Sequence, residues 1–219
     1  MTAGPTQEAL DPVRYLTNHS TGKMGYALAK AAVQRGAQVT LIHGPTALPP
    51  VRFAQDLPVT TAQQMFEAVD GAFDSLDVLV MAAAGADDYD LILMDAAVAD
   101  YRPVSVAEHK IKKSDGDMSI PLARTPDILG TLAPRKAGQF VCGFSMETQD
   151  LEANSAAKLH KKNLDLIVAN NLKVSGAGFG VDTNVVTLIG PEGARHLPLM
   201  SKEDVAHAIW DEILARRSQ

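Results

Sequence analysis

The sequence predicts an α/β fold: a doubly wound, mostly parallel, Rossmann-like sheet with a flap and a small β-hairpin added to it. Short apolar runs rich in β-branched residues alternate with longer amphipathic segments, a pattern typical of a parallel sheet covered by helices. A glycine-containing turn joins the first run to the first amphipathic segment, as in folds that bind ligands at strand ends. The 219 residues, 46% of them hydrophobic, suffice for the core of one domain.

The first six residues are expected to form a strand that runs into a turn. Gly4 and Thr6 offer N–H and hydroxyl donors to a phosphate, whereas Pro5 has no N–H to donate. Residues 11–16 are expected to form a connecting loop. Because the chain begins abruptly at this strand, we expect it to be one domain of a longer polypeptide.

The turn before the first helix is the strongest candidate for binding an anion. Ser20, Thr21 and Gly22 expose backbone N–H groups at a helix start, where the helix dipole is positive. Lys23 adds a cation, while Gly22 and Gly25 let a ligand and a neighbouring strand come close. The same residues also suit an ordinary strand-to-helix turn, and they match neither the P-loop nor the Rossmann glycine motif.

A strand–helix–strand unit follows from this turn. Apolar residues at helical spacing predict a helix over residues 23–35, which Gly36 ends. Residues 38–44 are predicted to be a short strand, and residues 45–58 a proline-rich loop. His43 stands at the strand end with no metal-type ligand spaced near it, so we interpret it as a structural residue or a residue of the site's rim.

The next helix, with Thr60 or Thr61 as its N-cap, is followed by a near-repeat in the sequence. Residues 77–87 and 90–100 have almost the same apolar pattern. Each copy suits a buried parallel strand, and the first also suits an extension of the helix. We assign the second copy to the site because it continues into the lysine-rich segment, and Asp95 within it suggests a rim that faces a ligand.

Residues 104–117 are predicted to form an exposed flap. If the flap is extended, Lys110 and Lys112 lie on one side of it, although a lysine cluster in a loop is also typical of a solvated surface. Residues 119–122 are a candidate strand. Thr125 is then expected to cap a short helix with Pro126 at its first position, which provides a second helix N-terminus for an anion.

The last part of the chain continues the alternation. Residues 139–145 and 165–170 are predicted strands, joined by a helix over residues 149–162 in which Lys158 and Lys162 share a face. These lysines suit either a helix end on the surface or a site for a polyanion. A hairpin near residues 184–197 and a final amphipathic helix capped by Ser201, with Trp210 in the core or an interface, complete the fold.

The composition of the chain excludes some classes of binding partner. The net charge of −6 argues against nucleic acid as a partner, and no apolar run is long and clean enough to span a membrane. The one cysteine, Cys142, sits in a strand-like run, so it is interpreted as a buried core residue in a reducing, cytoplasmic compartment. The anion-receptive turns and clustered lysines, expected to meet at the strand ends, indicate a nucleoside triphosphate or a similar polyanion.

A resemblance to a known family adds the reaction. The segments T-A-G-P-T at 2–6, D-P-V-R-Y at 11–15, T-N-H-S-T-G-K-M-G at 17–25, A-A-V-A-D-Y-R at 96–102, K-I-K-K at 110–113, T-P-D-I-L at 125–129, G-F at 143–144 and residues 158–170 resemble phosphopantothenoylcysteine synthetase. In bacteria that enzyme is usually the C-terminal half of a bifunctional coenzyme A biosynthesis protein. The resemblance implies one synthetase domain over residues 1–219, without the flavin-dependent decarboxylase half and without flavin.

The resemblance implies ligation of 4′-phosphopantothenate with L-cysteine. Bacterial members use CTP and Mg²⁺ or another divalent metal, through an acyl-cytidylate that the cysteine amine attacks. Fixed N–H groups and lysines suit this reaction because charge develops on phosphate and acyl oxygens. A cytoplasmic homodimer is expected, with no nucleic acid or membrane partner and with a decarboxylase domain as a candidate partner in the full-length protein.

The resemblance also implies residue roles. Asn18 falls on the asparagine that binds the intermediate, and Lys110 on the flap lysine that turns the intermediate over. The metal ligands stay open. The expected nucleotide-binding residues, which combine the anion-receptive turns with the positions implied by the family, are Gly4, Thr6, Ser20, Thr21, Gly22, Lys23, Met94, Asp95, Ala96, Asp100, Lys110, Pro126, Asp127, Ile128, Leu129, Phe144, Lys158 and Lys162.

The sequence departs from the family pattern at three places. Pro5 replaces a glycine of the phosphate loop, Asp95 occupies a position that is usually small and neutral, and the near-repeat lengthens a helix-to-strand passage. None of these changes falls on Asn18 or Lys110. A nucleotide-binding regulatory domain without chemistry would not need the flap lysine. A dinucleotide oxidoreductase would need the Rossmann glycine motif and an acid at the second strand end, which the sequence lacks.

Overall fold

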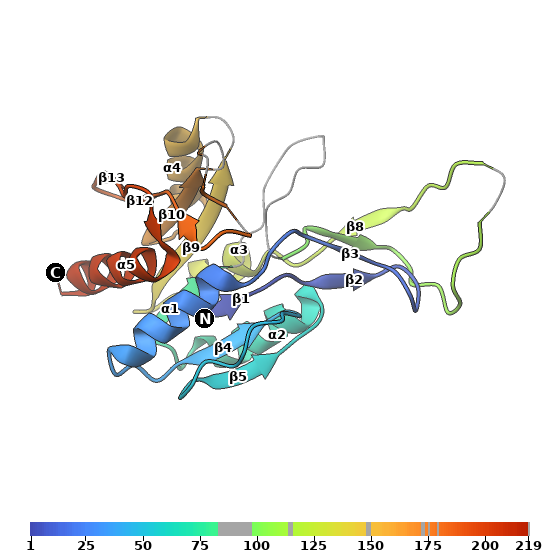
Figure 1. The fold of residues 1–219 in the computed structure, drawn as a ribbon, viewed down its shortest axis with the longest axis horizontal. Coiled ribbons are helices and arrows are strands. Elements are labelled where there is room, and N and C mark those ends of the chain that lie inside the picture. Colours follow the sequence, from blue (N-terminus) through green and yellow to red (C-terminus); the bar gives the residue numbers. More distant parts are fainter. Residues whose placement is uncertain are drawn as a thin grey trace.

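The computed structural model describes residues 1–82, 98–113, 116–147, 150–171, 174, 176–178 and 180–218. Eight strands form the central sheet in the order β13-β12-β10-β9-β6-β1-β4-β5 (Figure 1). Strands β5, β4, β1, β6, β9 and β10 run parallel, whereas β12 and β13 are antiparallel to their neighbours. The mostly parallel Rossmann-like sheet predicted from the sequence is therefore confirmed.

The strands of this sheet are short, and most are buried. They span Thr2–Ala3 (β1), Thr40–His43 (β4), Gln55–Pro58 (β5), Val78–Met81 (β6), Phe140–Glu147 (β9), Leu166–Asn171 (β10), Val186–Gly190 (β12) and Gly193–His196 (β13). From β1 the chain moves outward to β4 and β5, then returns to the other side of β1 with β6, β9 and β10. The order reverses between β1 and β6, which is where such sheets bind ligands.

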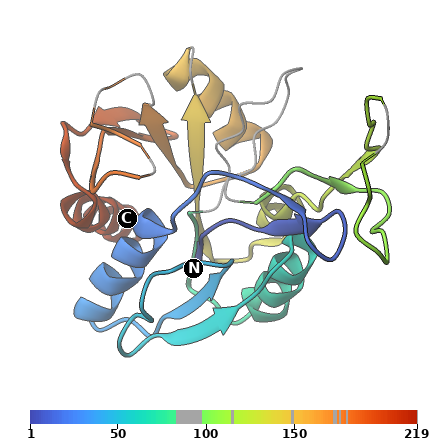
Figure 2. The same cartoon turned by 45° about the vertical axis from the view of Figure 1, so that its right-hand side comes forward.

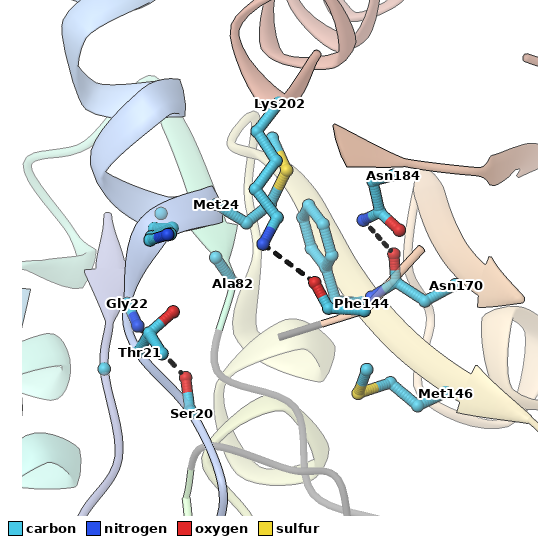
Figure 3. A pocket seen from close by; sticks show the side chains of 14 residues that line it. Ser20, Thr21, Gly22, Met24, Ala82, Phe144, Met146, Asn170, Asn184 and Lys202 are labelled. Atoms are coloured by element: carbon cyan, nitrogen blue, oxygen red, sulfur yellow. Dashed lines mark hydrogen bonds between the residues drawn. The ribbon is translucent and has the colours of Figure 1, made fainter. Parts of the chain in front are cut away.

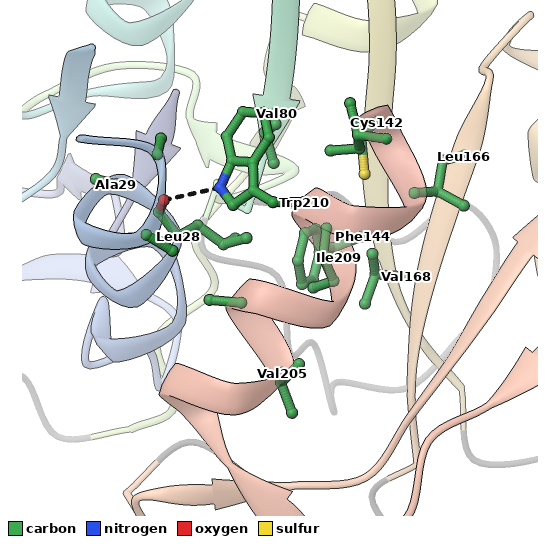
Figure 4. Packing of buried hydrophobic residues seen from close by; sticks show 14 of the residues in the cluster. Leu28, Ala29, Val80, Cys142, Phe144, Leu166, Val168, Val205, Ile209 and Trp210 are labelled. Atoms are coloured by element: carbon green, nitrogen blue, oxygen red, sulfur yellow. Dashed lines mark hydrogen bonds between the residues drawn. The ribbon is translucent and has the colours of Figure 1, made fainter. Parts of the chain in front are cut away.

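Helices cover both faces of the sheet. They are α1 (Lys23–Gln34), α2 (Ala62–Phe73), α3 (Ile128–Leu132), α4 (Leu151–Lys161) and α5 (Lys202–Arg217), with a 3-10 turn at Ala133–Arg135. One core cluster joins α1 and α5 to the sheet, and a second joins α2, α3 and α4 to its other face. Trp210 of α5 is buried in the first cluster, and its Nε1 donates to the Leu28 carbonyl at 3.0 Å (Figure 4).

A two-part ribbon projects from the sheet, as Figures 1 and 2 show. It consists of the hairpin β2 (Gln7–Ala9) and β3 (Tyr15–Thr17), beside the antiparallel pair β7 (Tyr101–Pro103) and β8 (Leu122–Arg124). The flap lies between β7 and β8. A further small pair, β11 (Thr183–Asn184) with β14 (Met200–Ser201), lies before α5.

Several local predictions are confirmed. Thr61 caps α2 with a complete capping box, and Ser201 accepts a hydrogen bond from the Asp204 N–H at the start of α5. Cys142 is a fully buried strand residue whose thiol has a raised pKa, chiefly because of burial. His43 is structural, with its ring nitrogens next to the Gly44 carbonyl and Asp56.

Four local predictions need correction. The loop expected at residues 45–58 contains the edge strand β5, and the loop expected at 11–16 contains the turn of the β2–β3 hairpin and most of β3. Of the two alternatives left open for the first copy of the near-repeat, the strand is confirmed, because residues 78–81 form β6. Residues 90–97 of the second copy lie outside the described residues.

The third correction concerns α3, and the fourth concerns the strand that follows the flap. Its N-cap is Asp127, not Thr125, and Pro126 therefore lies before the helix. The Thr125 hydroxyl donates to the Ala99 carbonyl at 2.5 Å, so this tertiary contact takes the side chain that was expected to cap the helix. The candidate strand at 119–122 is likewise shifted, because β8 begins only at Leu122.

Candidate active site

An open pocket lies where the parallel strands end and α1 begins (Figure 3). Its walls come from the β1 turn, the start of α1, the ends of β6, β9 and β10, the loop before β11 and the start of α5. It is lined by Gly4, Ser20, Thr21, Gly22, Lys23, Met24, Gly25, Ala82, Phe144, Met146, Asn170, Gly178, Asn184 and Lys202. The sheet thus places its cavity at the edge that its topology predicts for a ligand.

The start of α1 is shaped by glycine. Gly22 is the N-cap with φ 77°, a left-handed conformation that glycine adopts without strain, and no side chain caps the helix. A Cβ on Gly25 would lie 2.5 Å from the Ala3 Cβ and 2.9 Å from the Thr2 carbonyl oxygen. The first turn of α1 therefore packs tightly against β1. Its N–H groups, which lack a side-chain cap, make this end of the pocket receptive to an anion.

Lys23 is engaged at the rim of the pocket. Its Nζ donates to Asp182 Oδ1 at 2.7 Å and to the Gly180 carbonyl at 3.1 Å. The same hydrogen bond is the main reason that the pKa of Asp182 is lowered. The mobile cation expected from the sequence is therefore fixed to the loop before β11 in this structure.

Lys202 is a second cation in the pocket wall, and it was not predicted. The residue is 7% exposed, and its Nζ donates to the carbonyl oxygens of Val181 at 2.6 Å and Gly178 at 2.8 Å. Burial is the main cause of its lowered pKa, and the nearby Lys23 adds to it. Its position in the sequence could have indicated a special role. A lysine directly after an N-cap is unfavourable for the helix dipole, so such a lysine is expected to have a separate function.

The opposite wall combines apolar and amide groups. Phe144 and Met146 come from β9, while Asn170 at the end of β10 accepts a hydrogen bond from Asn184 Nδ2 at 2.8 Å. The register of β9 and β10 pairs Met146 with Asn170. Among these four residues, only Phe144 was predicted, because strand pairing and not sequence spacing brings the others together.

A second set of predicted residues meets at residues 98–100. Asn18 Nδ2 donates to the Val98 carbonyl at 3.2 Å, and Thr6 Oγ1 accepts from the Ala99 N–H at 2.9 Å. The Asp100 carbonyl accepts from the Thr125 N–H at 2.8 Å. Thr6 is fully buried, so in this structure its hydroxyl holds the chain rather than facing the pocket.

A third set meets at the start of α3. Asp127 caps the helix through the Gly130 N–H and lies 3.1 Å from Lys162 Nζ. Ile128 and Leu129 are buried. Pro126 precedes this cap, and Lys158 lies one turn before Lys162 on α4. This set lies on the face of the sheet opposite Phe144, because α3 packs in the second core cluster and Phe144 in the first.

Lys110 lies on the exposed flap, apart from the pocket lining. Ile111, next to it, is held by Asp11 and Arg14 of the β2–β3 turn. Met94, Asp95 and Ala96 lie outside the described residues, so their expected contact with a base stays a prediction.

The side chains around the pocket fit a metal ion that is bound mainly through the phosphate groups of a substrate. No group of three His, Cys, Asp or Glu suited to a metal occurs among the described residues, and the described pocket lining contains no carboxylate. A Mg²⁺ ion is commonly held by substrate phosphates, water and one or two carboxylates. Asp182, paired with Lys23 at the rim, is a described candidate for such a carboxylate.

The described part of the chain has no helix with the length and apolar content needed to cross a membrane.

Comparison with known proteins places these observations in a family. The model of the "DNA/pantothenate metabolism flavoprotein C-terminal domain" matches residues 1–89 and 85–216, two segments that overlap within the near-repeat. The coenzyme A biosynthesis bifunctional protein CoaBC of Bacillus subtilis is 51% identical over 221 residues, covering 100% of this chain and 51% of the relative. The CoaBC protein of Escherichia coli strain K12 is 41% identical over 220 residues, covering 99% and 51%. The chain thus spans about half the length of these relatives.

Solved structures agree with the fold. A crystal structure of the C-terminal domain of CoaBC has a TM-score of 0.78 at 41% identity and covers 98% of this chain and 94% of that one. A Cab2 variant solved in complex with phosphopantothenate-cysteine has a TM-score of 0.75 at 19% identity, covering 99% of this chain and 85% of that one. At that identity the second likeness supports the fold alone.

Proposed function

The chain belongs to the family of the C-terminal domain of the coenzyme A biosynthesis protein CoaBC, and from that membership we propose that it is a phosphopantothenate–cysteine ligase. It joins 4′-phosphopantothenate to L-cysteine with CTP and yields 4′-phosphopantothenoylcysteine, a step of coenzyme A biosynthesis. The reaction takes place in the cytoplasm.

The proposed reaction has two steps. A carboxylate oxygen of 4′-phosphopantothenate attacks the α-phosphorus of CTP, which forms an acyl-cytidylate and releases pyrophosphate. The cysteine amine then attacks the acyl carbon, a C–N bond forms, and CMP leaves as the amine loses a proton. Both steps build negative charge on phosphate or acyl oxygens, so fixed N–H groups and lysines lower the barrier.

The pocket at the start of α1 is the observation that carries this proposal. It brings six predicted nucleotide-binding residues together: Gly4, Ser20, Thr21, Gly22, Lys23 and Phe144. The helix start without a side-chain cap supplies N–H donors for the triphosphate, and Phe144 supplies an apolar surface. A divalent metal bound with CTP would neutralise charge on its phosphate oxygens, with Asp182 at the rim as a candidate ligand.

Asn18 and Lys110 are the residues proposed to act on the intermediate. The Asn18 amide donates to the carbonyl of Val98, which follows the segment expected to contact the base, and the proposed role of this amide is to hold the acyl group. Lys110, carried by the flap, stabilises charge when the cysteine amine attacks. The start of α3 and the lysines of α4 complete the nucleotide site from the other face of the sheet.

A second copy of this chain is the proposed partner, and the ribbon is the surface that supports it. Apolar side chains that are at least 40% exposed gather there: Val13, Tyr15, Tyr101, Val104, Val106, Met118 and Leu122. Exposed apolar groups gathered in one region are typical of an interface. The decarboxylase half of the full-length relatives is a further proposed partner, with no role for flavin in this chain.

Pyrophosphate release tests the proposal. The chain is incubated with Mg²⁺, 4′-phosphopantothenate and either CTP or ATP, with and without L-cysteine. We expect release that requires 4′-phosphopantothenate and prefers CTP. Lys110→Gln should slow amide formation more than release, while Lys113→Gln in the same flap serves as the matched control. No release with either nucleotide from folded protein would contradict the proposal and leave a nucleotide-binding domain without chemistry.

A further inference from the structure

Asp11, in the turn between β2 and β3, accepts an unusual number of hydrogen bonds. Its side chain is fully buried. Oδ1 accepts from the N–H groups of Val13 at 2.8 Å and Arg14 at 2.9 Å, which closes the turn of the hairpin. Oδ2 accepts from Arg14 Nη2 at 2.6 Å, Arg14 Nε at 3.0 Å and the Ile111 N–H at 3.1 Å. One oxygen therefore serves the hairpin, and the other serves Arg14 and the flap.

The contact with Ile111 joins two parts of the chain that are 100 residues apart. Both backbone groups of Ile111 are engaged, because its carbonyl also accepts from Arg14 Nη2 at 3.0 Å. A third bond runs from the Ala107 N–H to the Leu10 carbonyl at 3.0 Å. The flap, otherwise without helix or strand in its described residues, is thus fastened to the hairpin directly beside Lys110.

The charge of Asp11 is stable in this setting. Hydrogen bonds from the Arg14 guanidinium hold the pKa of the carboxyl well below its ordinary value, with further contributions from the backbone N–H groups. A buried carboxylate needs such a full set of donors because an unpaired buried charge is very costly. Removing the charge should therefore loosen the hairpin turn and the flap, whose N–H groups donate to Asp11.

We propose that Asp11 is a positioning residue, which fixes the flap backbone at Ile111 and so places Lys110 for its work in the second step of the reaction. The effect on Lys110 rests on the proposed function. The fastening of the flap does not, because it is argued from contacts within the hairpin and flap alone. Asp11 is not among the described residues that line the pocket, so its proposed influence on catalysis passes through the flap.

Asp11→Asn separates the two roles of the side chain. The amide keeps one oxygen, which can serve the hairpin turn or the flap, but not both. Its NH₂ group then faces N–H donors, so one set of hydrogen bonds is lost while the size of the side chain is unchanged. Glu108→Gln makes the same chemical change on an exposed flap residue and is the matched control.

Trypsin cleavage at the flap lysines tests the fastening without any substrate. We expect Asp11→Asn to be cleaved on the order of tenfold faster than the unchanged chain, because hydrogen bonds to a charged group are lost. Glu108→Gln should be cleaved at the original rate. In the unchanged chain, the Ile111 amide should exchange hydrogen more slowly than that of Lys113, a measurement that stays decisive if Asp11→Asn fails to fold. Equal exchange at the two amides, or unchanged cleavage of folded Asp11→Asn, would overturn the proposal.

A double-mutant cycle tests the link to Lys110. Asp11→Asn should lower the rate of amide formation in the unchanged chain and have little further effect when Lys110 is already replaced by glutamine. Rate losses that multiply would show that Asp11 acts independently of Lys110 and would overturn the positioning role. If no ligation occurs at all, the proposed function fails, while cleavage and exchange still decide whether Asp11 fastens the flap.

Discussion

The pocket and the ribbon are held in place by different forces. Around the pocket, α1 packs tightly on β1 at Gly25, and buried apolar side chains fix the helices on both faces of the sheet. In the ribbon, many apolar side chains face solvent, and a buried carboxylate fastens the flap. In the proposed function, the closely packed region holds the nucleotide, while the ribbon offers a surface to the partner and presents Lys110.

Gly25→Ala should have the largest effect on the packed side of this comparison. The new Cβ would overlap Ala3, so the free energy of unfolding should fall by about 1–3 kcal/mol. Gly71→Ala is the matched control in α2, where a Cβ would meet nothing within 4 Å; it should stabilise the protein by about 0.5–1 kcal/mol. Urea unfolding of both variants measures the difference. Equal stability of the two variants would show that α1 does not depend on close contact with β1.

Lys202→Met should weaken the wall of the pocket. It removes two charged hydrogen bonds to the carbonyl groups of Gly178 and Val181, which should lower the free energy of unfolding by about 1–3 kcal/mol. Lys161→Met, an exposed change at the end of α4, should change it by less than about 0.5 kcal/mol. Nucleotide affinity, measured by calorimetry, should fall only in the first variant. Equal nucleotide affinity of the two variants would show that Lys202 does not belong to the nucleotide site.

Charge on the ribbon should change assembly and leave the packed side intact. In the double variant Val104→Asp with Leu122→Asp, carboxylates replace exposed apolar groups, so we expect a dimer to become a monomer in sedimentation experiments. Phe53→Asp alters a side chain that is 82% exposed outside the ribbon and should leave the dimer in place. Dissociation in the control, or a dimer in the ribbon variant, would contradict the assignment of the interface.

The smallest expected effect concerns pH. The contribution of Asp11 to the free energy of unfolding should not change with pH over a wide range. The pKa of Asp11 is depressed in the folded protein, so the stability it contributes is complete above its unfolded pKa of about 3.9 and is lost as the pH falls through the lower folded value. The difference in unfolding free energy between the unchanged chain and Asp11→Asn should be constant from about pH 5 to 8. It should shrink below about pH 4. If the difference in unfolding free energy changes between pH 6 and 8, another group must titrate together with the contacts that Asp11 makes to Arg14 and Ile111.

The sequence predicted the packed region well and the ribbon poorly, for physical reasons. The helix α1 buries apolar residues at helical spacing, and β10 is a short buried apolar run, so both were predicted. The edge strand β5 of the sheet was missed, because it is exposed along its whole length and has no alternating pattern. The β2–β3 hairpin depends on its turn at Asp11, whose partner Ile111 is remote in sequence.

The candidate site divides in the same way. Its anion-receptive turn was recognisable because Gly22 and Gly25 are local signals. Lys202 and Asn170 reach the pocket only through helix packing and the register of β9 with β10, which no spacing in the sequence encodes. The cap of α3 was placed two residues early because Thr125 and Asp127 are both good caps, and a tertiary contact chose between them.

Mass spectrometry of the complete reaction is the most direct test of the proposed ligase activity. The chain is incubated with Mg²⁺, CTP, 4′-phosphopantothenate and L-cysteine, and the amide product, CMP and pyrophosphate are quantified together. We expect the three products in equal amounts, with none formed when 4′-phosphopantothenate is omitted. CTP cleavage without the amide product, or cleavage that does not need 4′-phosphopantothenate, would contradict it.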